Sequence, residues 1–261
     1  MNMIKNGDIV TRNSYQNDIL FYVDKIINSE NRGKIAILKG VTIRIEADSP
    51  VEDLKISNNI DIEDKFSQLE KRIDGCNNLD GRSKIKYGKI LHIDGDKNYS
   101  EKTDLYYKKR GLNYIVKHIA EYRQPENIIP LLEQNKPDIL VITGHDGMIR
   151  KGRNYNDINN YRNSRHFISA VKQARLYNAN KNDLVIFAGA CQSFYEALIS
   201  VGANFASSPG RILIDFMDPL IVAESISTTE KNKIIFMSDL EQKIRNGRKA
   251  VGGIGARGKK M

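Results

Sequence analysis

The sequence predicts an α/β protein, in which a mostly parallel sheet carries helices on both faces and follows a small N-terminal β-barrel. From residue 86 onward, short apolar runs typical of buried strands alternate with helical segments, which is the pattern of a parallel sheet. Before residue 49, short segments alternate apolar and polar side chains between glycine turns. With 261 residues, of which 40% are hydrophobic and 28% charged, the chain is long enough for a sizeable core.

The N-terminal segment 1–48 is predicted to hold three or four short strands. We expect strands at residues 9–11, 19–23 and 41–46, with turns at 31–33 and 40. So many short strands in so few residues favour a barrel of the SH3-like kind, which is usually a docking domain. Residues 49–85 are polar and are expected to form a connector with a helix near 62–73. Cys76 lies in this connector and is interpreted as an incidental thiol.

The remaining segment, 86–261, is predicted to be one α/β domain. Continuous apolar runs predict strands that are covered on both faces, at residues 89–94, 138–143 and 183–188. Weaker patterns predict two further strands, at 203–214 and 234–236. Amphipathic spacing predicts helices between and after them, at 102–121, 126–134, 164–178, 193–201, 217–226 and 239–247.

Two of these strands end in residues that can carry out acyl chemistry. The strand 138–143 leads into His145, and the strand 183–188 leads into Cys191. Open parallel sheets bind ligands at the carboxyl ends of their strands, which lie about 4.8 Å apart. We therefore expect His145 and Cys191 to meet at one edge of the sheet. Small residues next to them would let a substrate backbone approach closely, namely Gly144, Gly147, Gly189 and Ala190.

This pair predicts a cysteine peptidase. The thiolate of Cys191 would attack a carbonyl, while His145 takes the thiol proton and returns it to the leaving amine. The oxyanion would be stabilised by the N–H of Cys191 and by that of Asp146 or Gly147. A helix starting near residue 193 would favour the thiolate. A buried cysteine alone is more often a small hydrophobe, so the prediction depends on the pair.

The two strand ends resemble those of the clan CD peptidases, which include caspases, metacaspases, legumain and gingipain. The resemblance is carried by residues 139–143 with His145 and Gly147, then by 184–188 with Ala190 and Cys191. It implies a caspase-like or flavodoxin-like sheet and a Cys-His mechanism. Caspases have His and Gly as neighbours, whereas Asp146 stands between them here, so the second oxyanion donor is either Asp146 or Gly147.

Four segments resemble a narrower group, the YabG family of sporulation proteases from endospore-forming bacteria. They are GDIVTRNSY at 7–15, GHDG at 144–147, FAGACQSFYEALI at 187–199 and GGIGARGKK at 252–260. The resemblance implies a protease that processes spore coat and germination proteins. It also implies a place in the mother-cell cytoplasm or at the forespore coat.

The wider clan also suggests a specificity. In its arginine-specific members, an acid at the end of the first strand lines the S1 pocket. Here the strand 89–94 ends at Asp94, with Asp96 close behind. The resemblance implies that one of these carboxylates binds a P1 arginine, less readily a lysine, although a strand-end Asp can equally be a turn or cap residue. Asp215 and Asp218 are reserve candidates. With basic P1 specificity, self-cleavage in the connector could occur at Lys71, Arg72, Arg82 or Lys84.

The net charge of +9 suggests a different class of function. Residues 242–261 hold seven basic residues and no acid, so they form either a solvated tail or a contact for a polyanion. The alternative function is a non-catalytic scaffold or nucleic-acid binder built on the barrel and tail, but the rest of the chain is nearly balanced in charge. A glutamine-amidotransferase-like amidase is disfavoured, because its histidine follows the nucleophile along the chain.

Neither a cofactor nor a metal is expected. The G-x-G-x-x-G at 253–258 lies too close to the end of the chain for a helix to follow it, and no CxxC occurs. No apolar run is long enough for a signal peptide or a membrane span, so we expect no membrane partner.

Overall fold

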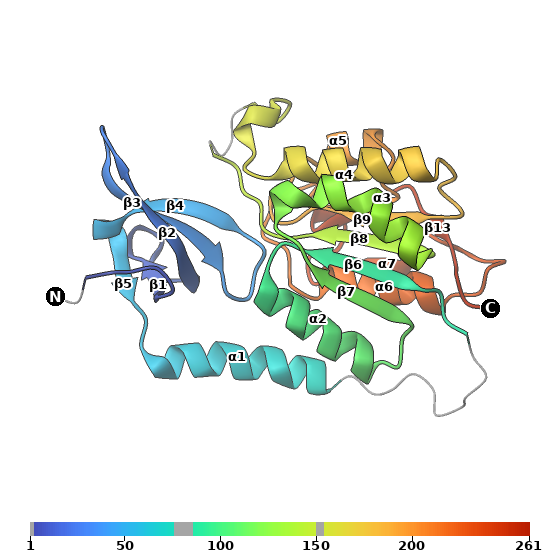
Figure 1. Cartoon of the computed structure of the whole chain (residues 1–261). Helices are drawn as coiled ribbons and strands as arrows, with labels where there is room; N and C mark the ends of the chain where they lie inside the picture. The colour runs from blue at the N-terminus through green and yellow to red at the C-terminus, as the bar shows by residue number, and fades with distance from the viewer. Residues whose placement is uncertain (1–2, 76–85, 150–153) are drawn as a thin grey trace.

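The computed structural model describes residues 3–75, 86–149 and 154–261 (Figure 1). Its N-terminal part is an antiparallel five-stranded sheet of order β4-β3-β2-β1-β5. The strands are β1 (Ile9–Arg12), β2 (Phe21–Ser29), β3 (Gly33–Gly40), β4 (Glu46–Pro50) and β5 (Leu54–Ile56).

This sheet stays open, so the expected SH3-like closed barrel is not confirmed. The edge strands β4 and β5 do not pair with each other. The reason lies in the core: Val10, Phe21, Val23 and Leu38 belong to the same buried cluster as Phe187 of the large sheet. The apolar face of this sheet is therefore buried by the rest of the molecule, so closure into a barrel is not required to bury it.

The connector holds one long helix, α1 (Asn59–Asp74), which confirms the helix expected near 62–73. It starts at Asn58, whose side chain accepts a hydrogen bond from the N–H of Asp61, as an N-cap does. Leu69 and Ile73 are buried, and the helix packs against α2. Cys76, Arg82 and Lys84 lie outside the described residues.

The large sheet has six strands in the order β12-β10-β9-β8-β6-β7. They are β6 (Ile90–Asp94), β7 (Tyr114–His118), β8 (Ile139–Thr143), β9 (Val185–Ala188), β10 (Phe205–Ser207) and β12 (Val251–Gly253). All pairs are parallel except that of β10 with β12. Numbered from β6 along the chain, the parallel strands lie in the order 2-1-3-4-5. This is a doubly wound arrangement, in which the strand order switches from one side to the other between β6 and β8.

Helices cover both faces of this sheet, as expected (Figure 1). One face packs against α3 (Gln124–Asn135), α4 (Ser164–Tyr177) and α5 (Tyr195–Ser200). The other packs against α2 (Lys97–Lys109) and α6 (Asp218–Thr228). Successive strand residues alternate between two buried clusters, with Leu140 in one and Ile139 and Val141 in the other. Because both faces are buried, β8 and β9 have continuous apolar sequences.

The helix expected at 102–121 was wrong in its second half. The helix α2 ends at Lys109, and Gly111 follows it with a φ of 66°, a conformation that favours glycine and stops the helix. Residues Tyr114–His118 form the edge strand β7 instead. Its β-branched Ile115 and Val116 fit a strand better than a helix.

The C-terminal segment is folded, which excludes the solvated tail. The expected helix at 239–247 is reduced to α7 (Met237–Leu240). Beyond it, β12 extends the large sheet, and β13 (Ala256–Arg257) pairs with β11 (Ile234–Ile235). Lys259 is buried, and its Nζ donates to the carbonyls of Asn182 and Asp183. Among the described helices, none is long and apolar enough to cross a membrane.

Candidate active site

His145 follows β8 and is fully buried at the carboxyl edge of the sheet. Its backbone N–H donates to Oε1 of Glu121 at 2.7 Å. Its ring stacks on that of Tyr99, with 5.2 Å between the centroids. Burial lowers the pKa of His145 to about 4, so the imidazole is neutral in this arrangement.

The neighbours of the ring fix its tautomer. Nε2 lies 3.2 Å from the carbonyl oxygen of Gly40, which can only accept a hydrogen bond, so Nε2 carries the proton. Nδ1 is then the basic nitrogen. It has no hydrogen-bond partner among the described residues, and it lies 3.8 Å from Oδ2 of Asp96. The imidazole thus has a free lone pair and a carboxylate that can stabilise the imidazolium.

Cys191 lies at the end of the next strand and is also fully buried. The chain leaves β9 through Gly189, whose φ of 109° few other residues adopt. The sulfur accepts from the N–H of Ile214 at 3.2 Å. Burial raises the pKa of this thiol to about 12. The helix α5 begins only at Tyr195, so no helix end favours the thiolate here, contrary to the expectation.

A segment of the N-terminal sheet lies between these strand ends, an arrangement that no sequence pattern indicated. Residues 40–46 connect β3 to β4 and cross the site. The carbonyl oxygen of Arg44 accepts hydrogen bonds from the N–H of Asp146 and from that of Cys191, each at 3.2 Å. These are two of the three backbone donors that we expected to bind an oxyanion.

The side chain of Arg44 enters a closed pocket and is fully buried. Its Nη1 lies 2.5 Å from Oδ2 of Asp94, and its guanidinium lies over the rings of Tyr99 and Phe216, at 4.7 and 5.3 Å from their centroids. Burial alone would raise the pKa of Asp94, but the charge of Arg44, together with His92 and the N–H of Asp96, outweighs burial and holds that pKa far below the usual range. The pocket therefore presents one carboxylate between two aromatic walls, a suitable environment for an arginine.

A chain of hydrogen bonds orients Asp94 from behind. The hydroxyl of Thr143 donates to Oδ2 of Asp94 at 2.8 Å, and it accepts in turn from Nε2 of His92. Nδ1 of His92 accepts from the hydroxyl of Tyr107 at 3.0 Å. The other oxygen, Oδ1, accepts from the N–H of Asp96. His92 thus supports the carboxylate through Thr143.

Asp146 holds the loop that follows β8. Its carboxylate accepts from the hydroxyls of Ser164 and Ser193 and from the N–H groups of Asn163 and Gly147. Burial raises the pKa of Asp146 to about 6. Because the N–H of Gly147 is bound to this carboxylate, the N–H of Asp146 is the one that faces the carbonyl of Arg44.

The glycines that we expected near the substrate have different surroundings. A Cβ on Gly147 would lie 2.2 Å from the carbonyl oxygen of Glu46, so only glycine allows the 40–46 segment to approach this closely. A Cβ on Gly189 would instead meet Leu198 and Ser193. Gly147 thus touches the segment that crosses the site, while Gly189 shapes the turn that carries Cys191.

The reserve acids Asp215 and Asp218 lie outside the arginine pocket. Asp215 forms two hydrogen bonds with Arg72 of α1, at 2.8 and 2.9 Å. Asp218 accepts from the N–H of Asp215, and burial raises its pKa to about 7. Both carboxylates connect α1 and α6 to the loop before α6, although Asp215 also forms a backbone bridge with Ile43.

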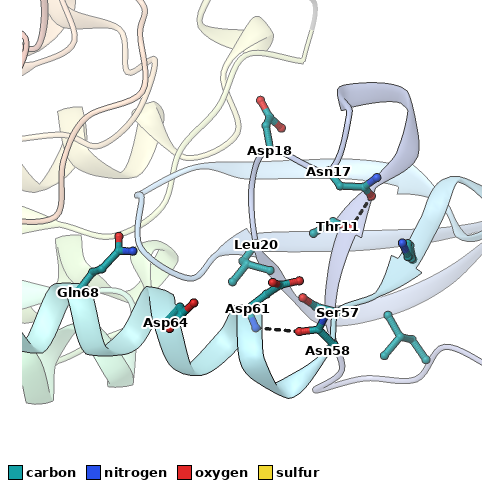
Figure 2. A pocket seen from close by; sticks show the side chains of 11 residues that line it. Thr11, Asn17, Asp18, Leu20, Ser57, Asn58, Asp61, Asp64 and Gln68 are labelled. Carbon is teal, nitrogen blue, oxygen red and sulfur yellow. Dashed lines mark hydrogen bonds between the residues drawn. The ribbon is translucent and has the colours of Figure 1, made fainter.

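Hollows surround the crossing segment without opening onto the thiol. One of about 230 Å³ is lined by Tyr22, Gly40, Asp96 and Tyr99, beside His145. Two more, of about 500 and 380 Å³, both touch Thr42 and Ile43. A further pocket of about 400 Å³ lies between the N-terminal sheet and α1 and contains none of the candidate residues (Figure 2). Among the described residues, no group of His, Cys, Asp and Glu could hold a metal ion.

Comparison with known proteins identifies the family to which this chain belongs. The sporulation-specific protease YabG of Bacillus subtilis (strain 168) is 37% identical over 97% of this chain and 94% of its own length. Among solved structures, the A domain of carboxylic acid reductase from Segniliparus rugosus, in complex with AMP and a co-purified carboxylic acid, matches with 13% identity and a TM-score of 0.31 over 76% of this chain and 26% of that one. A similarity that weak supports no argument about fold or chemistry. The YabG peptidase U57 family, by contrast, matches residues 5–261, and this chain belongs to that family.

Proposed function

We propose that this sporulation protease is a cysteine endopeptidase that cleaves after arginine, with Cys191 as the nucleophile and His145 as the general base. The observation that carries the proposal is the position of Arg44. Its carbonyl oxygen is bound by the N–H groups of Asp146 and Cys191, and its guanidinium is bound by Asp94. A P1 arginine of a substrate would fit the same three contacts.

The proposed reaction follows from these contacts. Nδ1 of His145 takes the thiol proton, and the sulfur of Cys191 attacks the carbonyl carbon of the P1 residue. The negative charge that develops on the carbonyl oxygen is stabilised by the N–H groups of Cys191 and Asp146. The imidazolium, stabilised by Asp96, then protonates the leaving amine. Water hydrolyses the thioester and regenerates the thiol.

The substrate-binding residues have distinct proposed roles. Asp94 selects the P1 arginine, and Asp96 acts on His145 rather than on the substrate. Gly147 leaves space for the backbone on the leaving-group side, and Gly189 shapes the turn before the nucleophile. A thiol with a pKa near 12 is a poor nucleophile at neutral pH, so transfer of its proton to His145 has to accompany the attack on the carbonyl carbon.

The substrates that we propose are spore coat and germination proteins, processed in the mother cell. Membership of the YabG family and the similarity to a sporulation-specific protease support this. The N-terminal sheet is proposed to help to dock protein substrates.

The test compares the wild type with Cys191→Ala and His145→Ala on peptides that carry Arg, Lys or Leu at P1. Cys76→Ala and His166→Ala are the matched controls. We expect cleavage after Arg by the wild type and both controls, and none by the two site variants. If all five proteins behave alike, His145 and Cys191 have a structural role, and the non-catalytic scaffold is the better hypothesis for the function.

A further inference from the structure

We propose that the bond between Arg44 and Ile45 is the enzyme's own first substrate, and that residues 40–46 close the active site until this bond is cut. The inference rests on the proposed function and extends it to a processing site within the chain. It differs from the self-cleavage expected in the connector, because the bond lies in the N-terminal sheet.

The backbone of this segment follows the course of a bound peptide. Ile43 forms an antiparallel bridge with Asp215, and Ile45 forms a parallel bridge with Asp146. Single β-bridges therefore hold the residues on both sides of Arg44, as backbone pairing holds a bound peptide. The N–H of Ile45 donates to the carbonyl of Ile43, so the chain bends at Arg44 and presents its carbonyl oxygen to Cys191.

The side chain of Arg44 is held in a way that suits a transient occupant. Only Nη1 has a hydrogen-bond partner, Asp94, while Nε and Nη2 have none among the described residues. A buried charge that serves only to stabilise a fold generally has its donors satisfied, because each unpaired donor is costly. The pocket therefore binds an arginine side chain, but it leaves two donors of Arg44 unpaired, as expected where Arg44 is a temporary occupant.

The segment also blocks the site. The carbonyl of Gly40 contacts Nε2 of His145. The side chain of Arg44 fills the pocket at Asp94, and its carbonyl oxygen is bound to both oxyanion donors. No second peptide can reach Cys191 while residues 40–46 stay in place. The hollows on either side of Thr42 and Ile43 would join into one groove once the segment moved away.

Cleavage of the Arg44–Ile45 bond is an ordinary peptide hydrolysis. The sulfur of Cys191 bonds to the carbonyl carbon of Arg44, the bond from that carbon to the nitrogen of Ile45 breaks, and His145 transfers the thiol proton to this nitrogen. Water then releases Arg44 with a free carboxylate and restores the thiol. The products are residues 1–44 and 45–261.

The experiment follows purified wild type, Cys191→Ala, Arg44→Lys and Arg32→Gln by intact mass and N-terminal sequencing. Arg32 is an exposed arginine of the same sheet, so its variant is the matched control. We expect the wild type and Arg32→Gln to acquire a new N-terminus at Ile45, at a rate independent of protein concentration. Cys191→Ala should stay intact, even when mixed with processed wild type, and Arg44→Lys, which keeps the positive charge, should be processed more slowly.

Hydrolysis of an arginine peptide is followed in parallel, because it separates the two hypotheses. We expect a lag in peptide hydrolysis that ends as the Arg44–Ile45 bond is cut. Immediate hydrolysis by a chain that stays whole, or is cut only elsewhere, overturns the inference and leaves the peptidase standing. A wild type that cuts neither itself nor any peptide overturns the proposed function as well.

Discussion

The carboxylate of Asp94 and the guanidinium of Arg44 lie 2.5 Å apart, and both side chains are fully buried. They come from different parts of the chain, since Asp94 ends β6 and Arg44 lies between β3 and β4. The pair joins the N-terminal sheet to the large sheet through the pocket that would select a substrate. Changes in this pocket should therefore alter specificity and folding together.

Replacing Asp94 with Asn should remove the preference for arginine. The wild type is expected to prefer an arginine peptide over its uncharged isostere, the citrulline peptide, by about 100-fold in kcat/KM, because a buried ion pair loses one partner. Asp94→Asn should cleave the two peptides at similar rates. A variant that keeps the arginine preference would show that another group selects P1.

Replacing Thr143 with Val should weaken the same pocket more mildly. The change removes the hydroxyl that donates to Asp94, at a cost of about 1–3 kcal/mol in unfolding free energy. KM for the arginine peptide should rise, with kcat little changed. Thr103→Val is the matched control, because the hydroxyl of Thr103 is buried without a hydrogen-bond partner among the described residues. Urea unfolding and peptide kinetics check both variants, and equal effects would contradict the assigned role of Thr143.

Replacing Asp96 with Asn should shift the pH dependence of peptide cleavage. The negative charge of Asp96 raises the pKa of His145 against the effect of burial. Its removal should lower that pKa and move the acidic limb of the kcat/KM profile by about one pH unit to lower pH. Asn also caps helices well, so α2 should remain stable.

Tyr22→Phe is the control for this shift. It removes the hydroxyl that donates to Asp96 but keeps the charge, so the limb should stay in place. If Asp96→Asn and Tyr22→Phe gave the same profile, Asp96 would not act through its charge.

Glu121 should make the protein less stable as the pH rises. Burial raises the pKa of this carboxyl from 4.5 to about 7, so the folded state holds a proton that the unfolded state releases. The stabilisation is complete below about pH 4.5 and is lost as the pH rises through 7, by about 3 kcal/mol in all. Unfolding of Cys191→Ala with and without Glu121→Gln, from pH 5 to 8, measures it. The Gln variant should show a flatter dependence, and an unchanged slope would assign the effect elsewhere.

Most of the large sheet could be predicted, because β8 and β9 are covered on both faces and their sequences are continuously apolar. The same reasoning placed His145 and Cys191 at one edge, where His145 contacts Gly40 and Cys191 contacts Arg44 of the same 40–46 segment. The edge strand β7 was missed because Tyr114, Ile115 and Val116 lie partly exposed at helical spacing from earlier residues. The role of Arg44 could not be predicted, because its partner Asp94 is distant in sequence and no local pattern indicates the contact.

The pairing of β3 with β4 decides what a cut between Arg44 and Ile45 would leave behind. Lys39 and Glu46 are direct partners on either side of the cut, and the pairing continues to Ile35 and Pro50. The pieces 1–44 and 45–261 would therefore stay together through the sheet, as a complex of two chains. Its stability would then depend on protein concentration, as that of any dimer does. Strong dilution would release Tyr22 and Gly40 with the shorter chain, and with them the groups that contact Asp96 and His145.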